Sequence, residues 1–355
     1  MMPSEIKKTT ISLKKFKDDL LRNSVNLAAI YDEPLIIPKK KRVQPFLWKW
    51  AEIERLLFQS LEFQDKLPTG QAGAERRILR LQNPGLDGET VTETMSMSVQ
   101  LLMPGEFARP HRHTPVAFRF FLKGNSYTTV HGEKYQMSPG DLVLTPYMQW
   151  HEHGNDGIEP GIWIDGLDFP MVRYFDAVIK EDIEVPQEYK KRTGTSNRRF
   201  SSAGLRPSWI PQSELQRESL VHFRWENTEK TLFALAEGGD FSPTEDIILE
   251  YINPTNGNSV FYTIGCYIQM IRAGVKTKEY KENVHKIFHV FRGKGKTIID
   301  SKEFIWSEGD FFVVPSGSWH YHENTSKNPA ILFSLQDKPT LMRLGLYRQE
   351  IKKTA

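Results

Sequence analysis

A long internal repeat constrains the fold of this chain more than any other feature of its sequence. When the chain is displaced by 169 residues, a set of turn and aromatic residues falls on identical partners without a gap. The pairs are Gly105 and Gly274, Gly124 and Gly293, Gly140 and Gly309, Pro146 and Pro315, Trp150 and Trp319, His151 and His320, His153 and His322, and Asn155 and Asn324. A period of this length indicates two copies of one folding unit, so we expect two domains of the same architecture.

Each copy consists of short alternating apolar runs bounded by glycine and proline. This pattern is typical of an antiparallel sandwich or barrel, so we expect an all-β chain of two barrels. Residues 12–31 and 46–61 carry apolar side chains at helical spacing and predict a helical lead-in that caps a barrel. The expected organisation is a lead-in with the first strands at 1–90, barrel 1 at 91–170, a bridge at 171–246, barrel 2 at 247–340 and a tail at 341–355.

Three histidines of the first copy predict a metal site in that barrel. His111 and His113 are two residues apart, so on a strand their side chains point to the same face. Ala117 and Arg119 continue the alternation on that face, and His151 follows across a turn on an adjoining strand. Neutral imidazole binds Fe(II), Zn, Cu, Ni or Mn, so the histidines leave the ion open. Three protein ligands leave positions free for catalysis. The alternative is an ordinary polar strand.

The two histidine segments resemble the sequence outline of a cupin barrel. The first reads GEFARPHRH from Gly105, and the second reads GDLVLTPYMQWHEHGN from Gly140. Phe118 and Phe120 point away from the histidine face, as expected where a sheet packs on both sides. Cupins usually add a glutamate three or four residues after the second histidine, but position 117 is alanine. A metal here would keep three neutral ligands and an open side for an anionic chelate.

The second copy differs from the first where the chemistry would occur. Tyr280 stands at the position of His111, Glu282 at that of His113, and Phe288 at that of Arg119, whereas His320 is retained. A tyrosine, a glutamate and a histidine could hold a metal, and this possibility stays open. The favoured interpretation is a barrel that keeps its turn residues for folding and has lost the site.

Four further side chains are candidates for the pocket around the metal. Arg119 lies on the metal-facing side, and a guanidinium binds a carboxylate through two parallel hydrogen bonds. His153 lies two residues beyond His151, either as a core histidine bonded to a backbone carbonyl or as a proton carrier for the substrate. Gln100 and Asp165 are expected to border the pocket.

Composition excludes several other classes of protein. Hydrophobic residues make up 39% of the 355 residues and charged residues 26%, and the net charge of +3 predicts no nucleic-acid partner. No uncharged apolar run approaches the roughly 20 residues that cross a bilayer, so no membrane association is expected. The single cysteine, Cys266, suits a reducing compartment, and we expect a cytoplasmic protein. The basic run at 38–43 is interpreted as solvated surface rather than a nuclear-import signal.

Longer segments resemble gentisate 1,2-dioxygenase and its relatives that act on salicylate or 1-hydroxy-2-naphthoate. They are MPGEFARPHRHTPVAFRFFLKG, PGDLVLTPYMQWHEHGNDG and IWIDGLDFPMVRYFDA, together with ERRILRLQNPGL and FLWKWAEI. The resemblance extends over nearly the whole chain from about residue 40. It implies a bicupin of two jelly-roll barrels, commonly tetrameric, with one Fe(II) per chain at His111, His113 and His151.

The resemblance also implies roles for the pocket residues. Arg119 matches an arginine that meets the substrate carboxylate, and His153 would manage a hydroxyl proton. Gln100 and Asp165 match pocket residues. A second basic contact is expected from one or more of Arg76, Arg77 and Arg80, although an arginine in this run could equally lie on a surface strand.

The reaction implied is the insertion of both atoms of O2 into an aromatic acid, with ring opening between the carboxyl-bearing carbon and its hydroxylated neighbour. For gentisate the product would be maleylpyruvate. Three rivals remain: the same chemistry on salicylate or 1-hydroxy-2-naphthoate, a metal-dependent cupin isomerase or decarboxylase that needs no O2, and a non-catalytic binding or storage bicupin.

Overall fold

The computed structural model describes residues 12–25, 42–66, 77–88, 90–183, 194–201, 205–217 and 219–353. The chain divides into two compact units, Met1–Lys41 and Arg42–Ala355. In the first unit, α1 spans Leu13–Arg22, and the Ser12 hydroxyl caps it by accepting a 3.2 Å hydrogen bond from the Lys15 amide. No residue of α1 is buried. The remainder of the predicted helical stretch, from residue 26 to 31, lies outside the described residues.

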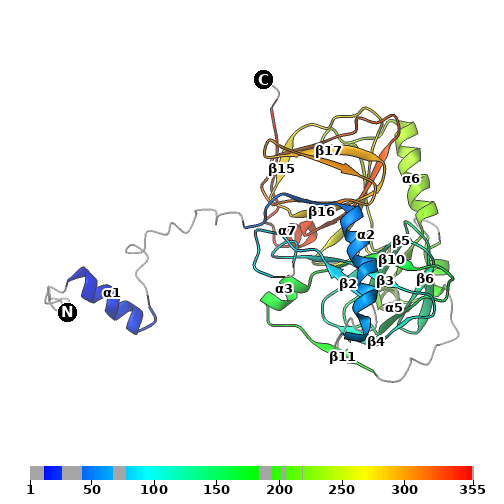
Figure 1. Ribbon diagram of the computed structural model, residues 1–355, viewed down its shortest axis with the longest axis horizontal. Coiled ribbons are helices and arrows are strands. Elements are labelled where there is room, and N and C mark those ends of the chain that lie inside the picture. The colour runs from blue at the N-terminus through cyan, green and yellow to red at the C-terminus, as the bar shows by residue number, and fades with distance from the viewer. Residues whose placement is uncertain are drawn as a thin grey trace. The chain divides into compact units, whose positions relative to one another are not determined.

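The second unit is built from two barrels, as the repeat predicts (Figure 1). The strands of barrel 1 are β2 (Arg77–Arg80), β3 (Ser96–Leu102), β4 (Phe107–His113), β5 (Ala117–Lys123), β6 (Ser126–Val130), β7 (Glu133–Met137), β8 (Leu142–Thr145), β9 (His151–Gly154), β10 (Gly161–Leu167), β11 (Lys180–Asp182) and β12 (His222–Phe223). They form a six-stranded sheet in the order β12-β8-β5-β10-β3-β2 and a five-stranded sheet in the order β11-β4-β9-β6-β7. The neighbouring strands in both sheets pair antiparallel.

Barrel 2 repeats this arrangement with the second half of the chain. Its strands are β1 (Phe46–Trp48), β13 (Ile247–Glu250), β14 (Gly265–Ile271), β15 (Tyr280–Glu282), β16 (Lys286–Arg292), β17 (Lys294–Ile299), β18 (Lys302–Ser307), β19 (Phe311–Val314), β20 (His320–Glu323), β21 (Ala330–Gln336) and β22 (Gln349–Ile351). The two sheets have the orders β1-β19-β16-β21-β14-β13 and β18-β17-β20-β15-β22. The expected all-β bicupin architecture is confirmed.

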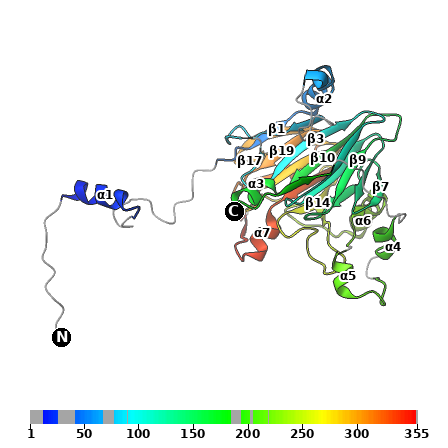
Figure 2. The same ribbon diagram turned by 90° about the horizontal axis from the view of Figure 1, so that it is seen from below.

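The helices of the second unit lie outside the sheets (Figure 2). They are α2 (Trp50–Gln59), followed by a 3-10 helix (Ser60–Lys66), α3 (Phe169–Tyr174), α4 (Thr195–Arg199), α5 (Gln212–Arg217), α6 (Trp225–Gly238) and α7 (Lys338–Arg343). The helix expected over 46–61 begins only at Trp50, because residues 46–48 pair with β19 instead. Within the described ranges, no helix has the length and apolarity to cross a membrane.

In each barrel, one edge strand comes from the segment that precedes the other barrel in the sequence. The lead-in strand β1 pairs with β19 of barrel 2, with Phe46 opposite Val313. The bridge strand β12 pairs with β8 of barrel 1, with His222 opposite Val143. Local hydrophobic pattern cannot reveal this exchange, because the paired residues are far apart in sequence.

The helix that follows each of these edge strands contacts a glycine-aspartate turn that occurs in both copies of the repeat. The Asp141 carboxylate accepts a 2.8 Å hydrogen bond from the Trp225 amide at the start of α6. A Cβ atom at the preceding Gly140, whose φ is +90°, would lie 2.6 Å from the Trp225 ring. Gly309 also has a φ of +90°, and a Cβ atom there would lie 2.4 Å from the ring of Trp50 in α2. The repeated glycines are therefore required both for their backbone conformation and for helix packing.

The two barrels share a hydrophobic core along their six-stranded sheets. Phe118 and Phe120 of β5 are fully buried, and their rings lie 5.2 and 4.3 Å from the ring of Phe333 on β21. The prediction that these phenylalanines pack away from the histidine face is confirmed. Because the apolar face of one barrel is covered by the other, both barrels belong to one compact unit.

Candidate metal centre and its cavity

Two neighbouring strands of barrel 1 bring the three predicted histidines together. His111 and His113 lie on β4, and His151 begins β9 directly opposite His111 in the antiparallel register. One ring nitrogen from each of them lies within 4.8 Å of the others. The described ranges contain no other group of histidine, cysteine and acidic side chains with this geometry. Alternation along β4 and strand pairing with β9 thus create a three-nitrogen site.

Backbone carbonyls fix the orientation of all three imidazole rings. The Nδ1 atoms lie 2.9, 2.6 and 2.8 Å from the carbonyl oxygens of Arg109, Pro115 and Gln149, respectively. A carbonyl oxygen only accepts, so each Nδ1 carries the proton and each Nε2 keeps its lone pair. Such an outer hydrogen bond is typical of histidines that bind metals.

The protonation state of His151 also fits a metal ligand. Burial lowers the pKa of His151 well below its usual value, and nearby positive charge from His111, Arg119 and His113 lowers it further. The side chain is completely buried, and its Nε2 atom has no hydrogen-bond partner among the described residues. A buried lone pair without a donor is costly unless it is satisfied by a ligand, so the residues present fit a bound divalent metal ion.

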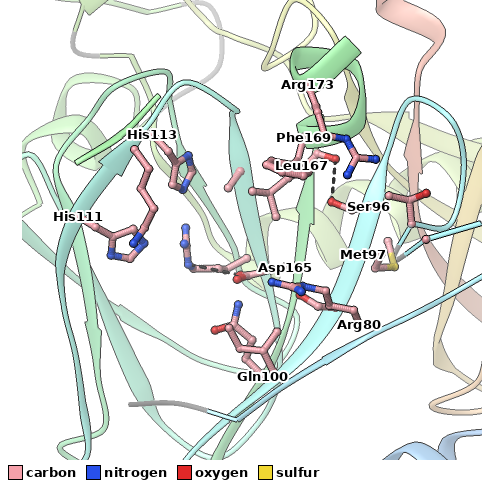
Figure 3. A pocket seen from close by; sticks show the side chains of 17 residues that line it. Arg80, Ser96, Met97, Gln100, His111, His113, Asp165, Leu167, Phe169 and Arg173 are labelled. Atoms are coloured by element: carbon pink, nitrogen blue, oxygen red, sulfur yellow. Dashed lines mark hydrogen bonds and ion pairs between the residues drawn. The ribbon is translucent and has the colours of Figure 1, made fainter. Parts of the chain in front are cut away.

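A cavity of about 470 Å³ opens beside this site (Figure 3). Its wall is formed by Ile78, Arg80, Gly88, Thr90, Ser96, Met97, Ser98, Gln100, His111, His113, Ala117, Arg119, Asp165, Leu167, Phe169, Arg173 and Lys180. Figure 3 shows His111 and His113 on one side of the cavity and Arg80 and Arg173 on the other. The mixture of an apolar wall with a few convergent charged groups is typical of a site for a small charged molecule.

Arg119 is the buried cation of this wall. Its side chain is 2% exposed, and its Nη1 donates to the Thr145 hydroxyl. Its Nε lies 3.5 Å from the Asp165 carboxylate on the neighbouring strand β10, and Trp163 in turn donates to Asp165 at 3.0 Å. Asp165 therefore orients the guanidinium and is itself oriented by the Trp163 indole, a residue that the sequence analysis did not single out.

The other predicted pocket residues differ in where their side chains lie. Gln100 on β3 lines the cavity, and its Oε1 is buried without a partner among the described residues. Arg80 also lines the cavity, from the exposed end of β2. Arg77 is buried and forms an ion pair with Glu106, so it does not line the cavity. Arg76 lies outside the described residues.

His153 is fully buried behind His151, with their ring centres 5.6 Å apart. Its Nδ1 lies 2.9 Å from the Thr128 hydroxyl, and the side chain is not part of the cavity wall. The repeat-related pair, His322 and Thr297, has the same contact at 2.8 Å in barrel 2. The contact thus belongs to the repeated fold, and a proton role for His153 stays a prediction.

In barrel 2 an ammonium group replaces the metal site. Lys286, which occupies the repeat position of Ala117, is completely buried, and its Nζ lies 2.5 Å from Glu282, 2.9 Å from Glu245 and 2.7 Å from the Tyr280 hydroxyl. Two of the residues that could have bound a metal in this barrel are therefore engaged with a lysine. The favoured expectation, a barrel whose site is lost, agrees with this geometry.

Comparison with known proteins first defines the class. A family model described as a cupin domain matches residues 98–167 and 267–335, one region in each barrel. The chain is thus a bicupin. Its two matched regions coincide with the two copies of the 169-residue repeat.

The relatives then define the family within that class. The chain is 35% identical over 323 residues to gentisate 1,2 dioxygenase 1 from Aquipseudomonas alcaligenes, covering 90% of each protein. It is 31% identical over 315 residues to 1-hydroxy-2-naphthoate 1,2-dioxygenase from Nocardioides sp. (strain KP7), covering 86% of this chain and 78% of that protein. The crystal structure of salicylate 1,2-dioxygenase from Pseudaminobacter salicylatoxidans superposes with a TM-score of 0.85 at 32% identity, covering 97% of this chain and 99% of the other. The chain belongs to this family of ring-cleaving dioxygenases.

Proposed function

We propose that this protein is an Fe(II)-dependent gentisate 1,2-dioxygenase that inserts both atoms of O2 into gentisate and yields maleylpyruvate. The observation that carries the proposal is the set of three oriented imidazoles beside a 470 Å³ cavity whose wall contains the buried Arg119. Gentisate is favoured as the substrate because the relative from A. alcaligenes, which matches 90% of the chain, is named for it.

The assignment of Fe(II) rests on the donor set and on the reaction. Three neutral nitrogens leave the full positive charge of the ion and several of its positions available. Ala117, on the cavity wall, offers no further ligand atom where many cupins have glutamate. When bound, ferrous iron would supply the electrons that activate O2, which zinc cannot do.

The protein's own side chains would bind and orient the aromatic acid. Arg119 is a cation in a nearly dry wall, so we assign it to the substrate carboxylate. Asp165 and Thr145 hold the guanidinium, which limits the orientations that the bound acid can take. Gln100 offers a buried amide to a ring hydroxyl. Fixed placement of the reacting groups lowers the entropic part of the barrier.

The test is oxygen uptake by iron-loaded protein with gentisate, salicylate and 1-hydroxy-2-naphthoate. We expect gentisate to have the highest kcat/KM, one mole of O2 consumed per mole of acid, and an ultraviolet band from the ring-opened product. Turnover that continues unchanged without oxygen would instead indicate a metal-dependent isomerase or decarboxylase. A higher kcat/KM for either of the other two acids would change the substrate assignment but not the proposed ring-cleaving reaction.

Two further expectations from the sequence stay predictions. A homotetramer would be seen directly by sedimentation in solution. A cytoplasmic location is predicted by the single cysteine, Cys266, which is buried as a free thiol.

A further inference from the structure

The cavity extends well beyond the space that one aromatic ring requires. A cavity of roughly 150 Å³ holds benzene, whereas this one measures about 470 Å³. Phe169 and Arg173, both from α3, the helix that follows β10, line the cavity on the side away from His111 and His113 (Figure 3). A substrate anchored at Arg119 would therefore leave room toward α3 for a ring substituent.

The chemistry of this outer part is set by Arg173. Its guanidinium carbon lies 5.5 Å from the centre of the Phe169 ring, so the planar group is held against an aromatic face. Among the described residues, no carboxylate forms an ion pair with Arg173. Lys180, another cation of the wall, differs because its Nζ lies 2.6 and 2.7 Å from the two carboxylate oxygens of Asp182.

Four cations line the cavity, and two of them, Arg119 and Arg173, have different surroundings. Arg119 is buried and positioned by Asp165, whereas Arg173 is exposed and keeps its hydrogen-bonding edge available to a ligand. A guanidinium prefers a flat or tetrahedral oxyanion that can accept two parallel hydrogen bonds. A neutral hydroxyl, such as the second hydroxyl of gentisate, would use only part of this capacity.

We propose that Arg173 determines specificity by binding a second acidic group, a carboxylate or sulfonate, on the side of the substrate ring away from Arg119. The substrate class of this protein then includes aromatic 2-hydroxy acids with a further anionic substituent para to the reacting hydroxyl. The inference rests on the proposed function, because it uses the same cavity and the same anchoring of the first carboxylate.

The experiment compares wild-type protein with Arg173→Gln, Arg173→Lys and a matched control, Arg343→Gln. Arg343 lies in α7, and its guanidinium also stacks on an aromatic ring, that of Tyr262 at 4.2 Å, but it does not line the cavity. The ligands are gentisate, 5-carboxysalicylate, 5-sulfosalicylate and 1-hydroxy-2-naphthoate. Dissociation constants are measured by calorimetry with zinc-loaded protein, and KM and kcat by oxygen uptake with iron-loaded protein.

We expect Arg173→Gln to weaken binding of the two dianionic acids about tenfold or more, while gentisate binding changes less than twofold. Arg173→Lys should recover part of the loss, and Arg343→Gln should change neither. An equal loss for all four acids would overturn the inference in favour of general charge attraction. The largest loss for 1-hydroxy-2-naphthoate would overturn it in favour of an apolar contact.

Failure of the proposed function gives a different result. Oxygen uptake would then be absent with every acid, while calorimetry would still report whether the dianionic acids depend on Arg173. Dianionic acids that bind the wild-type protein no better than gentisate would refute the role of Arg173 whatever the reaction.

Discussion

Replacement of Lys286 by methionine should strongly destabilise the protein, because it removes a fully buried cation from barrel 2. Lys286 lies between Glu245 and Glu282, and none of the three side chains is more than 13% exposed. Breaking a buried ion pair by removing one partner costs about 3–5 kcal/mol. Lys338 still lies 3.4 Å from Glu282, so one carboxylate keeps a partner. We therefore expect a loss near the lower end of that range, about 3–4 kcal/mol.

The assay is thermal and urea unfolding at pH 7. A loss of this size lowers the Tm of a large domain by roughly 6–15 °C. The matched control is Lys352→Met, since Lys352 pairs with Glu279 at 2.7 Å but is 60% exposed, and exposed pairs contribute about 0–1 kcal/mol. A third variant, Lys286→Met with Glu245→Gln and Glu282→Gln, removes the unpaired charges and should recover most of the loss. Equal Tm values for Lys286→Met and the control would refute the reasoning.

The pH dependence supplies an independent check. Burial alone would raise the pKa of Glu245, but the charge of Lys286 outweighs it and lowers the pKa from 4.5 to about 2. The ion pair therefore stabilises the wild-type protein fully above pH 4.5, and this stabilisation is lost as the pH falls toward 2. In Lys286→Met the largest opposing influence is gone and only the smaller ones of Lys338 and Tyr280 remain, so burial raises the pKa of Glu245. Protonation of Glu245 at acidic pH then removes the unpaired buried charge from the variant. The difference in free energy of unfolding between the wild-type protein and Lys286→Met should therefore become smaller from pH 7 to pH 4.

Three other predictions concern the metal site, the anion site and the helix anchor. His151→Ala should lose its iron, measured by elemental analysis, whereas the repeat-related His320→Ala should retain it; iron bound to both would contradict the ligand assignment. Arg119→Gln should raise the KM for gentisate about 10–100-fold with iron still bound, since a charged hydrogen bond contributes about 1.5–3 kcal/mol; an unchanged KM would remove its carboxylate role. Gly140→Ala should cost about 2–4 kcal/mol in urea unfolding, from backbone strain at φ +90° and overlap with Trp225. Gly105→Ala, at φ +80° with no atom within 4 Å, should cost only the strain, and equal losses would exclude the overlap.

The metal cluster could be predicted from the sequence because its geometry is local. Alternation places His111 and His113 on one face of a single strand, and His151 was expected across a turn on an adjoining strand, which the pairing of β4 with β9 shows. Arg119 follows from the same alternation along β5, and it does line the cavity. The period of a strand is independent of the rest of the fold, so the facing of His111, His113 and Arg119 needed no tertiary information, whereas the approach of His151 depends on the pairing of β4 with β9.

The features that the sequence analysis missed depend on contacts between distant segments. Because side chains alternate along a strand, Arg77 and Arg80 point to opposite faces of β2. Which of them faces the cavity follows only from the pairing of β2 with β3, where Arg80 lies opposite Ser98. Arg173 lies within the segment IWIDGLDFPMVRYFDA, but nothing in that pattern shows that it reaches the cavity from a short helix. Lys286 did have a signal, since the 169-residue offset places a lysine where barrel 1 has Ala117.

The exchange of edge strands bears on how the polypeptide matures during synthesis. Barrel 1 lacks the outer strand β12 until residues 222–223 have left the ribosome, and β1 has no partner until residues 311–314 emerge. Strand β1, the first of the unit to be synthesised, is thus among the last to be paired. Its aromatic residues stay without their strand partner through most of translation. Expression of either half alone should leave an open sheet edge, which is a known route to aggregation.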